Sequence, residues 1–181
     1  RRAGGRSTIV ELASGLLAER RSLVADSGRS FRAALEISQD CYPALFGLAR
    51  AQISMKQADR ALESLSALEP SFGNDPTWRA LNGQALYLAA RYDDAFQAVT
   101  DALTADPFNK SLLFMRADML VRKGLYRQAQ PLLDAYESVD PKNRDYLLLR
   151  ARTYDVGFKN RDEALLYLRK ASELYPDDPI V

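Results

Sequence analysis

The strongest constraint on the fold is a segment that recurs about every 34 residues. Pro107 and Pro141 are separated by one such interval, and Pro176 follows after an interval that is longer by a single position. In the same register, four-residue segments that end in alanine return upstream of the three prolines, at 92–95, 126–129 and 161–164. A fixed period of this length is typical of repeat proteins, in which each unit buries its apolar face against the next. The chain is therefore expected to be an array of equivalent units.

Each unit contains two stretches with helical periodicity. In the unit at 110–143, apolar residues recur at intervals of three and four over 112–120 and again over 129–136, and Lys123, Gly124 and Leu125 separate the two stretches. Such spacing predicts two amphipathic α-helices joined by a tight turn. The proline at the end of a unit stops its second helix, and the neighbouring Asp or Asn can cap the first helix of the next unit.

The register divides the chain into five helical hairpins. Residues 8–181 are expected to form a single domain, with a divergent repeat at 8–41 and regular repeats at 42–75, 76–109, 110–143 and 144–178. Residues 1–7 would be an N-terminal tail, and 179–181 would be the start of a following element that is truncated or missing.

Two of the repeats depart from the regular pattern. Pro70 comes three residues early, which predicts a shorter second helix in the repeat at 42–75. The repeat at 144–178 has one extra residue within 155–160. We expect this residue to lengthen the turn and to leave both helices intact.

The small residues of the predicted helices carry a resemblance to a known family. Position 8 of the repeats is occupied by Ala49, Gly83, Ala117 and Ala151, and position 20 by Ala61, Ala95, Ala129 and Ala164. With Tyr92 and Tyr126 at position 17 and proline near position 32, the sequence resembles the tetratricopeptide repeat family. The resemblance implies an all-α fold, a right-handed superhelical solenoid of antiparallel helix-turn-helix repeats whose helices cross closely at the small residues.

The resemblance also implies where such a chain binds. In the family a concave groove, lined by the first helix of each repeat, commonly receives a peptide or a helix of a partner protein. Mapped onto this sequence, the groove positions are Phe46, Arg50, Ile53, Gln84, Tyr87, Phe114, Asp118, Arg122, Leu148 and Arg152. Aromatic residues together with arginine are typical anchors of protein interfaces. The expected function is therefore a non-catalytic scaffold that binds another protein or a peptide in this groove.

Some of these positions are open to a second interpretation. Phe46, Phe114 and Leu148 are equally consistent with packing between adjacent repeats, and Asp118 with neutralising a nearby arginine. One subfamily holds the C-terminal carboxylate of chaperone tails with lysines and asparagines at defined groove positions. This sequence has Phe46 and Phe114 among those positions and lacks the clamp, so a chaperone tail is not the expected partner.

Composition excludes several other classes of function. Lys and Arg number 25 against 24 Asp and Glu, a formal net charge of +1, so no strong field favours nucleic acid or an anionic membrane. The chain has no histidine and one cysteine, Cys41, which removes the usual zinc sites and the Ser-His-Asp triad. It also has no glycine-rich phosphate loop. We therefore expect neither enzymatic activity nor a cofactor or metal.

The sequence leaves the compartment and a second function open. It has no apolar run long enough to span a membrane, so we expect a soluble chain without membrane insertion, for which the cytoplasm and a periplasm fit equally well. The alternative function is an assembly module that self-associates or joins a multiprotein complex through its ends, or that holds a small apolar ligand. A homo-oligomer is compatible with this alternative.

Overall fold

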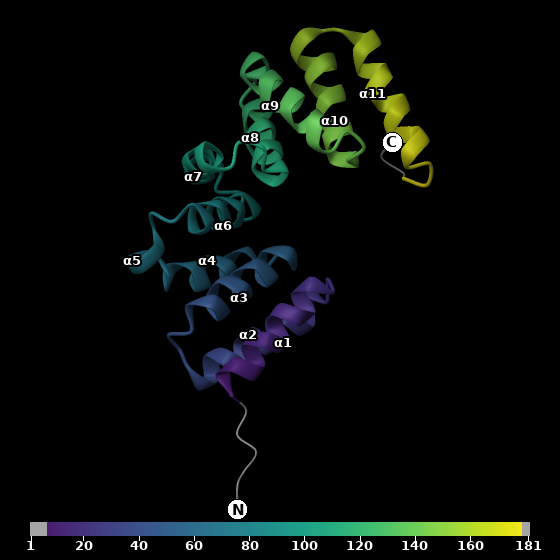
Figure 1. The fold of residues 1–181 in the computed structure, drawn as a ribbon. Helices are drawn as coiled ribbons and strands as arrows, with labels where there is room; N and C mark the ends of the chain where they lie inside the picture. The colour runs from purple at the N-terminus through teal and green to yellow at the C-terminus, as the bar shows by residue number, and fades with distance from the viewer. Residues whose placement is uncertain (1–6, 179–181) are drawn as a thin grey trace, which may run out of the picture. The chain divides into compact units, whose positions relative to one another are not determined.

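The computed structural model describes residues 7–178, which fold into helices without a β-strand (Figure 1). The predicted all-α repeat fold is confirmed. Of the predicted tail only Ser7 is described, and 179–181 also lie outside the described residues. The elements in chain order are α1 (Thr8–Arg20), α2 (Val24–Ile37), α3 (Tyr42–Ser54), α4 (Ala58–Ser66), α5 (Glu69–Phe72), α6 (Pro76–Leu88), α7 (Tyr92–Ala105), α8 (Lys110–Arg122), α9 (Tyr126–Val139), α10 (Arg144–Arg152), the π-helical segment η1 (Thr153–Phe158) and α11 (Arg161–Leu174).

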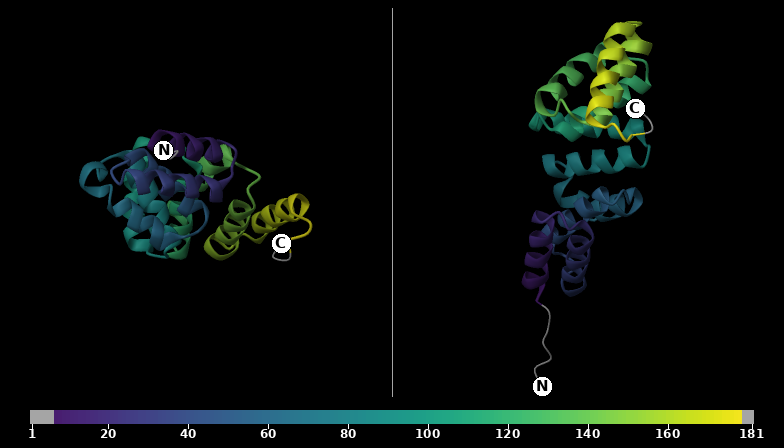
Figure 2. Two further views of the ribbon diagram at one scale, coloured as in Figure 1. Left: turned by 90° about the horizontal axis from the view of Figure 1, so that it is seen from below. Right: turned by 90° about the vertical axis from the view of Figure 1, so that its right-hand side faces the viewer.

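The helices group into two compact units, Arg1–Ala102 and Leu103–Val181, with the boundary near the end of α7. We call them unit 1 and unit 2 and describe each by itself. In unit 1, α1 packs against α2 and α3 against α4. In unit 2, α8 packs against α9 and α10 against α11. These pairs are four of the five predicted hairpins, and Figure 2 shows the helices from two further directions.

A left-handed residue closes every hairpin turn. Positive φ angles occur at Ser22 (58°), Lys56 (57°), Ala90 (57°), Gly124 (74°) and Lys159 (55°). Successive members of this series are separated by one repeat length, and only the last interval is longer, by the extra residue of the fifth repeat. Glycine adopts this backbone conformation without the steric cost that other residues meet. The backbone geometry of the turn is therefore repeated even where glycine is absent.

The same turns share one hydrogen bond, which ends the first helix of each hairpin. The amide after the left-handed residue reaches back over five residues to a helix carbonyl, as Leu125 does to Leu120 at 2.9 Å. Equivalent bonds join Gln57 to Gln52, Arg91 to Leu86 and Leu23 to Ala18. Such a bond with a left-handed residue inside it is the Schellman motif. It satisfies a carbonyl that the end of the helix would otherwise leave unpaired.

The fifth hairpin corrects the prediction made for its extra residue. The helix is not left intact, because α10 ends at Arg152 and continues as the π-helical η1. The amide of Asn160 still donates to the helix carbonyl at the equivalent position, that of Tyr154, at 3.0 Å, but this bond now spans six residues. Since the closing bond and the left-handed Lys159 are both kept, the additional residue widens the last helical turn. A widened turn of this kind is how α-helices commonly accommodate one inserted residue.

Small residues allow the helices of a hairpin to approach each other closely. A Cβ added at Gly83 on α6 would lie 2.9 Å from Cγ2 of Val99 on α7, closer than carbon atoms tolerate. In the divergent first repeat, the ring of Phe31 fills the space that side chains at Gly15 and Gly47 would occupy. Phe31 is fully buried. At Gly83, one of the predicted position-8 residues, the two helices are thus too close together for a larger side chain.

The second helix of the repeat at 42–75 is short, as its early proline predicts. α4 ends at Ser66, and Pro70 lies within the four-residue α5. Trp78 on α6 then packs into a cluster with Leu65 and Leu68. Its indole donates a hydrogen bond of 2.9 Å to the carbonyl of Leu65. This bond gives the buried indole N–H the partner that it needs.

Candidate functional site

The predicted groove residues of unit 1 lie on α3 and α6 and are all half-buried. Phe46 and Ile53 pack against the cluster that contains Trp78. The ring of Phe46 also meets that of Phe72 edge-on at 5.3 Å. Phe46 therefore has the packing role that the sequence left open for it.

Arg50 joins α3 to α1 through a bidentate ion pair with Glu19. Its Nε lies 2.6 Å from one carboxylate oxygen of Glu19, and its second nitrogen lies 3.1 Å from the other. About a third of each side chain is exposed. Because Glu19 occupies the Nε–Nη2 edge of the guanidinium, a ligand carboxylate would bind that edge only by displacing Glu19.

The other two predicted residues of unit 1 lie on α6. Gln84 is half-buried, and the ring of Tyr87 meets that of Tyr92 edge-on at 5.5 Å.

The predicted residues on α8 in unit 2 form a local pair. Asp118 is 8% exposed and accepts a hydrogen bond of 2.5 Å from Nε of Arg122 one turn later. This contact fits the neutralising role considered for Asp118. Phe114, on the same helix, lies 6.0 Å from the ring of Tyr136 on α9.

Leu148 and Arg152 line the largely apolar depression of unit 2. It measures about 400 Å³ and lies between α10, η1 and α11. Its lining consists of Leu148, Ala151, Arg152, Asp155, Val156, Arg161, Ala164, Leu165 and Leu168. We call this depression the trough. Its charged members are all solvent-exposed, so the trough combines an apolar surface with a rim of two cations and one carboxylate.

One lining residue indicates which structural element fits the trough. Leu168 has the repeat position of Leu65, Val99 and Leu133. Those three side chains are fully buried, whereas Leu168 is 37% exposed. In unit 1, the residue at this position lies under the first helix of the next repeat, as the contact between Leu65 and Trp78 shows. The trough therefore has the chemistry of a surface that receives a helix.

Reasoning from the sequence found only part of this site. The family pattern pointed to first helices and so gave Leu148 and Arg152, while Arg161, Leu165 and Leu168 on the second helix were missed. A signal for Leu168 existed, because it follows Leu133 by one repeat in the same register once the extra residue is counted. Its exposure depends on what covers it in three dimensions, which the pattern does not contain.

A buried arginine organises the interior of unit 2 and was also missed. Arg150 is 4% exposed and lies 2.5 Å from Asp134 and 3.4 Å from the hydroxyl of Tyr167. Its guanidinium also lies 5.5 Å from the ring centres of Tyr154 and Tyr167. Burial alone would lower the pKa of Arg150, but the hydrogen bonds that its guanidinium donates to Tyr167 and Asp134 raise it overall. A permanently charged arginine thus joins α9, α10 and α11.

Three buried tyrosines of unit 2 are held in the neutral form. Burial raises the pKa of Tyr136 to about 12, and the nearby carboxylates of Asp140 and Asp145 add to the shift. Burial also raises the pKa values of Tyr146 and Tyr167. These phenols are therefore uncharged at neutral pH, because ionisation would place a negative charge in a poorly solvated site.

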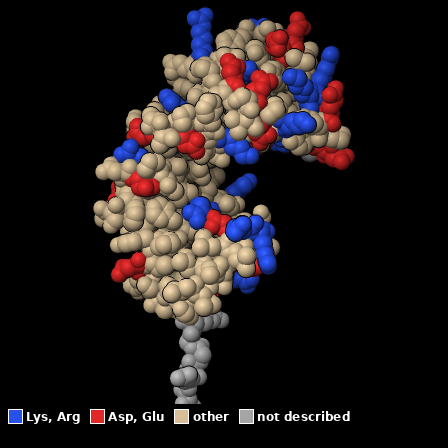
Figure 3. Space-filling view, in the orientation of Figure 1, with Lys and Arg blue, Asp and Glu red and all other residues tan. Residues whose placement is uncertain are grey.

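Charges of both signs are interspersed on the face drawn in Figure 3, among large areas of other residues.

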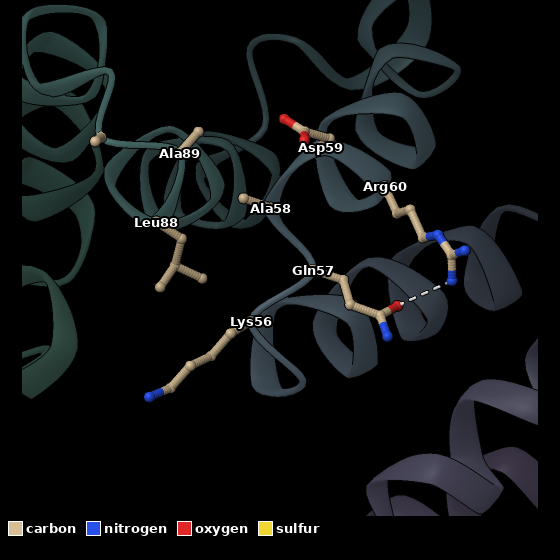
Figure 4. Close-up of a pocket in the computed structure, with 8 residues that line it drawn as sticks. Lys56, Gln57, Ala58, Asp59, Arg60, Leu88 and Ala89 are labelled. Atoms are coloured by element: carbon tan, nitrogen blue, oxygen red, sulfur yellow. Dashed lines mark hydrogen bonds between the residues drawn. The ribbon is translucent and has the colours of Figure 1, made fainter.

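Unit 1 has an open recess of about 570 Å³ at the turns around Lys56 and Ala90. Figure 4 shows its lining, in which Arg60 donates to Gln57 at 3.5 Å. Within residues 7–178 no three His, Cys, Asp or Glu side chains gather in a way that could hold a metal ion. No helix in the same range has the length and apolarity needed to cross a membrane.

Comparisons with solved structures agree with this repeat architecture. The chain is similar to the crystal structure of MamA protein, with a TM-score of 0.69 and 17% identity over 93% of this chain and 92% of that one. It is also similar to YrrB, described as a TPR protein with an unusual peptide-binding site (TM-score 0.67, 18% identity, 94% and 87% covered). A third similar structure is TTC0263, a thermophilic TPR protein of Thermus thermophilus (TM-score 0.67, 20% identity, 94% and 93% covered).

The family itself is settled by the sequence. No curated protein sequence matches the chain. The model of the tetratricopeptide repeat matches residues 25–85 and 86–153, which together make up more than half of the chain. Together with the five left-handed turns and the small-residue crossings, this match shows that the chain belongs to the tetratricopeptide repeat family.

Proposed function

We propose that this chain is a non-catalytic protein-interaction module that binds an amphipathic helix of another protein in the trough of unit 2. The observation that carries the proposal is the trough itself, in which exposed apolar side chains of η1 and α11 lie between Arg152 and Arg161. The similarity to YrrB, whose description names a peptide-binding site, is consistent with a peptide-like ligand. The fold by itself supports only the coarser statement that such modules bind proteins.

The composition of the trough defines its ligand. Val156, Leu165 and Leu168 are each between 37% and 46% exposed, and covering them would contribute about 1 kcal/mol per side chain. Arg152 and Arg161 flank this surface and favour carboxylates beside the apolar residues of the ligand. We therefore expect a helix with apolar residues at intervals of three and four and with Asp or Glu next to them.

Selection from a displayed library of helical peptides of about 14 residues tests this proposal. We expect selected peptides to carry the apolar spacing described above and to lose affinity about tenfold for Leu165→Ser combined with Leu168→Ser. The matched control is Phe108→Ser, which removes a 67% exposed side chain of unit 2 outside the trough. Selected peptides that bind the double variant and the parent chain equally well would disprove the trough as their site.

One observation favours assembly through the ends of the array as a second function. Val10 and Leu17 on α1 are 59% and 51% exposed. At the same repeat positions the later first helices carry buried residues, namely Ala44, Trp78, Leu112 and Tyr146 for the first and Ala51, Ala85, Met119 and Thr153 for the second. Such a face on α1 could pack against the apolar surface of α11 in a second copy, as successive repeats do.

Sedimentation at two protein concentrations distinguishes the two functions. Head-to-tail stacking predicts a mass that rises with concentration and returns to that of a monomer for Leu17→Ser, which leaves the trough untouched. A constant monomer mass in the parent chain would reject stacking while leaving peptide binding to be judged by the selection experiment.

A further inference from the structure

We propose that unit 2 has a second binding site at its turns, which takes an acidic peptide segment that carries one apolar or aromatic side chain. The site is a recess of about 520 Å³ lined by Gly124, Leu125, Tyr126, Arg127, Gln128, Gly157 and Phe158. We call it the edge site. It shares no lining residue with the trough, and it does not depend on the function proposed for the trough.

The extra residue of the fifth repeat builds one wall of the edge site. Gly157 in η1 lies directly against the ring of Tyr126, where any Cβ would overlap the Cγ of that ring. This close contact brings η1 onto the start of α9. Phe158 follows and is 37% exposed, with its ring 5.9 Å from that of Tyr154. Leu125, which also lines the recess, is 40% exposed. Two apolar side chains therefore face solvent beside one recess.

Unit 1 offers a matched comparison for this recess. The corresponding turns, around Lys56 and Ala90, also enclose an open recess, as Figure 4 shows. Its lining contains Gln57, Asp59 and Arg60 and no aromatic residue. Leu88 gives that recess an apolar side chain as well. Stacked turns thus form a recess by themselves, and the aromatic side chains of Tyr126 and Phe158 are particular to the edge site.

The two recesses also differ in the charged residues of their turn segments. The turn segments 122–128 and 155–162 contain five cations and two carboxylates. The corresponding segments of unit 1, 54–60 and 87–93, contain three cations and two carboxylates. Arg122 is paired with Asp118, but Arg127, Lys159 and Arg161 are all exposed. The edge site therefore lies in a local positive field, which a chain of formal charge +1 does not have as a whole.

The apolar side chains and the positive field of the edge site together indicate which ligand it binds. A positive field attracts carboxylates, and the recess between Leu125 and Phe158 is large enough for an apolar side chain. A nucleic acid would require a longer series of cations to follow its phosphates, and Asp155 and Asp162 interrupt this one. We therefore assign an acidic protein segment with an apolar anchor to this site.

Fluorescence anisotropy with a defined peptide tests the assignment. The probe is a labelled peptide in which Phe-Leu is flanked on both sides by three acidic residues, and a second peptide has Ser-Ser in place of Phe-Leu. We expect the first to bind the chain, the second to bind about fivefold more weakly, and salt between about 50 and 300 mM to weaken the first. Equal binding of the two peptides, or no binding of the first, would overturn the proposal.

Variants locate the binding. Phe158→Ser should weaken the probe about fivefold, and Arg127→Gln with Lys159→Gln about three- to tenfold. The control pair Lys56→Gln and Arg60→Gln removes two cations from the corresponding turn of unit 1 and should change nothing. Leu165→Ser with Leu168→Ser, which disables the trough, should also leave this affinity unchanged. Circular dichroism checks that each variant is folded. Loss of binding in the control pair instead, or tighter binding of a short single-stranded oligonucleotide than of the probe, would refute the edge site.

Discussion

Units 1 and 2 follow the same repeat but fill their interiors differently. At the first repeats of unit 1, glycines at 15 and 47 leave space for the single ring of Phe31, and apolar contacts dominate. In unit 2, Tyr154 and Tyr167 lie against the buried guanidinium of Arg150, and the rings of Tyr146 and Tyr136 continue from Tyr167. The repeat thus constrains the turns and the crossings of the helices. It leaves the chemistry between neighbouring hairpins free to vary, and this difference can be tested by measuring the stability of each unit.

The largest expected effect is in unit 1. Phe31→Ala should lower the free energy of unfolding by about 3–5 kcal/mol, because it empties a fully buried site. Denaturant unfolding followed by the fluorescence of Trp78, the chain's one tryptophan, reports on this unit. Gly47→Ala alone should also destabilise the unit, since its methyl group would overlap the ring. In the Phe31→Ala background the same methyl group should cost much less. Additive effects of the two changes would refute the close contact.

The corresponding change in unit 2 removes charge as well as volume. Arg150→Ala should cost about 2–3 kcal/mol through lost packing, hydrogen bonds and contacts with two aromatic rings. Arg150→Met should cost less, because a long apolar side chain restores the packing and Asp134 is exposed enough to be solvated. Near-ultraviolet circular dichroism of the tyrosines follows the transition. Arg169→Ala, at an exposed position on α11, is the control and should have little effect. Equal losses for the Ala and Met variants would indicate that charge, not packing, is the stabilising property.

Alkaline pH should increase the difference in stability between the two units. The pKa of Tyr136 is raised to about 12 in the folded chain, above the value of about 10 for an exposed tyrosine. Its stabilising contribution is therefore complete below about pH 10 and is lost as the pH rises toward about 12, by about 2 kcal/mol at most. Urea unfolding at about pH 8 and about pH 11, followed by the tyrosine signal, measures the loss. Tyr136→Phe should reduce the difference between the two pH values, and an unchanged difference would exclude this tyrosine as its source.

The smallest expected effects are of opposite sign in the two units. Ala90→Gly in unit 1 should stabilise the chain by about 0.5–1 kcal/mol, because it relieves a non-glycine residue of a left-handed conformation. Gly124→Ala at the same turn position of unit 2 should destabilise it by a similar amount. A Cβ at Gly124 would meet only a ring atom of Tyr126 at 4.0 Å, so packing does not complicate this comparison. Thermal unfolding of both variants gives the two signs, and a shift of the same sign in both would contradict the interpretation.

The period of the sequence was enough to predict the helical hairpins, and the resemblance to the tetratricopeptide repeat family predicted their small-residue crossings. Both features depend on residues within one repeat. Even Gly15 could have been found, since it lies one repeat length before Ala49. The network around Arg150 could not be predicted, because it depends on how three helices from two repeats meet. The form taken by the extra residue in the fifth repeat was also beyond the pattern, which does not show that the turn keeps its closing hydrogen bond.

For the groove residues, too, only part of the structure could be predicted from the sequence. Their positions on the first helices were readable from the sequence, but their partners were not. Arg50 pairs with Glu19, and Asp118 with Arg122, so both are already engaged within the folded chain. Whether any of the ten residues contacts a ligand stays a prediction, which the peptide experiments address most directly for Leu148 and Arg152.

The widened turn at η1 also bears on how such arrays change in length. One added residue is absorbed between Arg152 and Lys159, and α11 still places Ala164 and Ala171 in buried positions. An insertion at this point therefore alters the number of residues without altering the phase of the helix that follows. Natural variation in the length of these proteins should accordingly concentrate in the last turn of a first helix, and sequence alignments that allow no gap there would misassign every later residue by one.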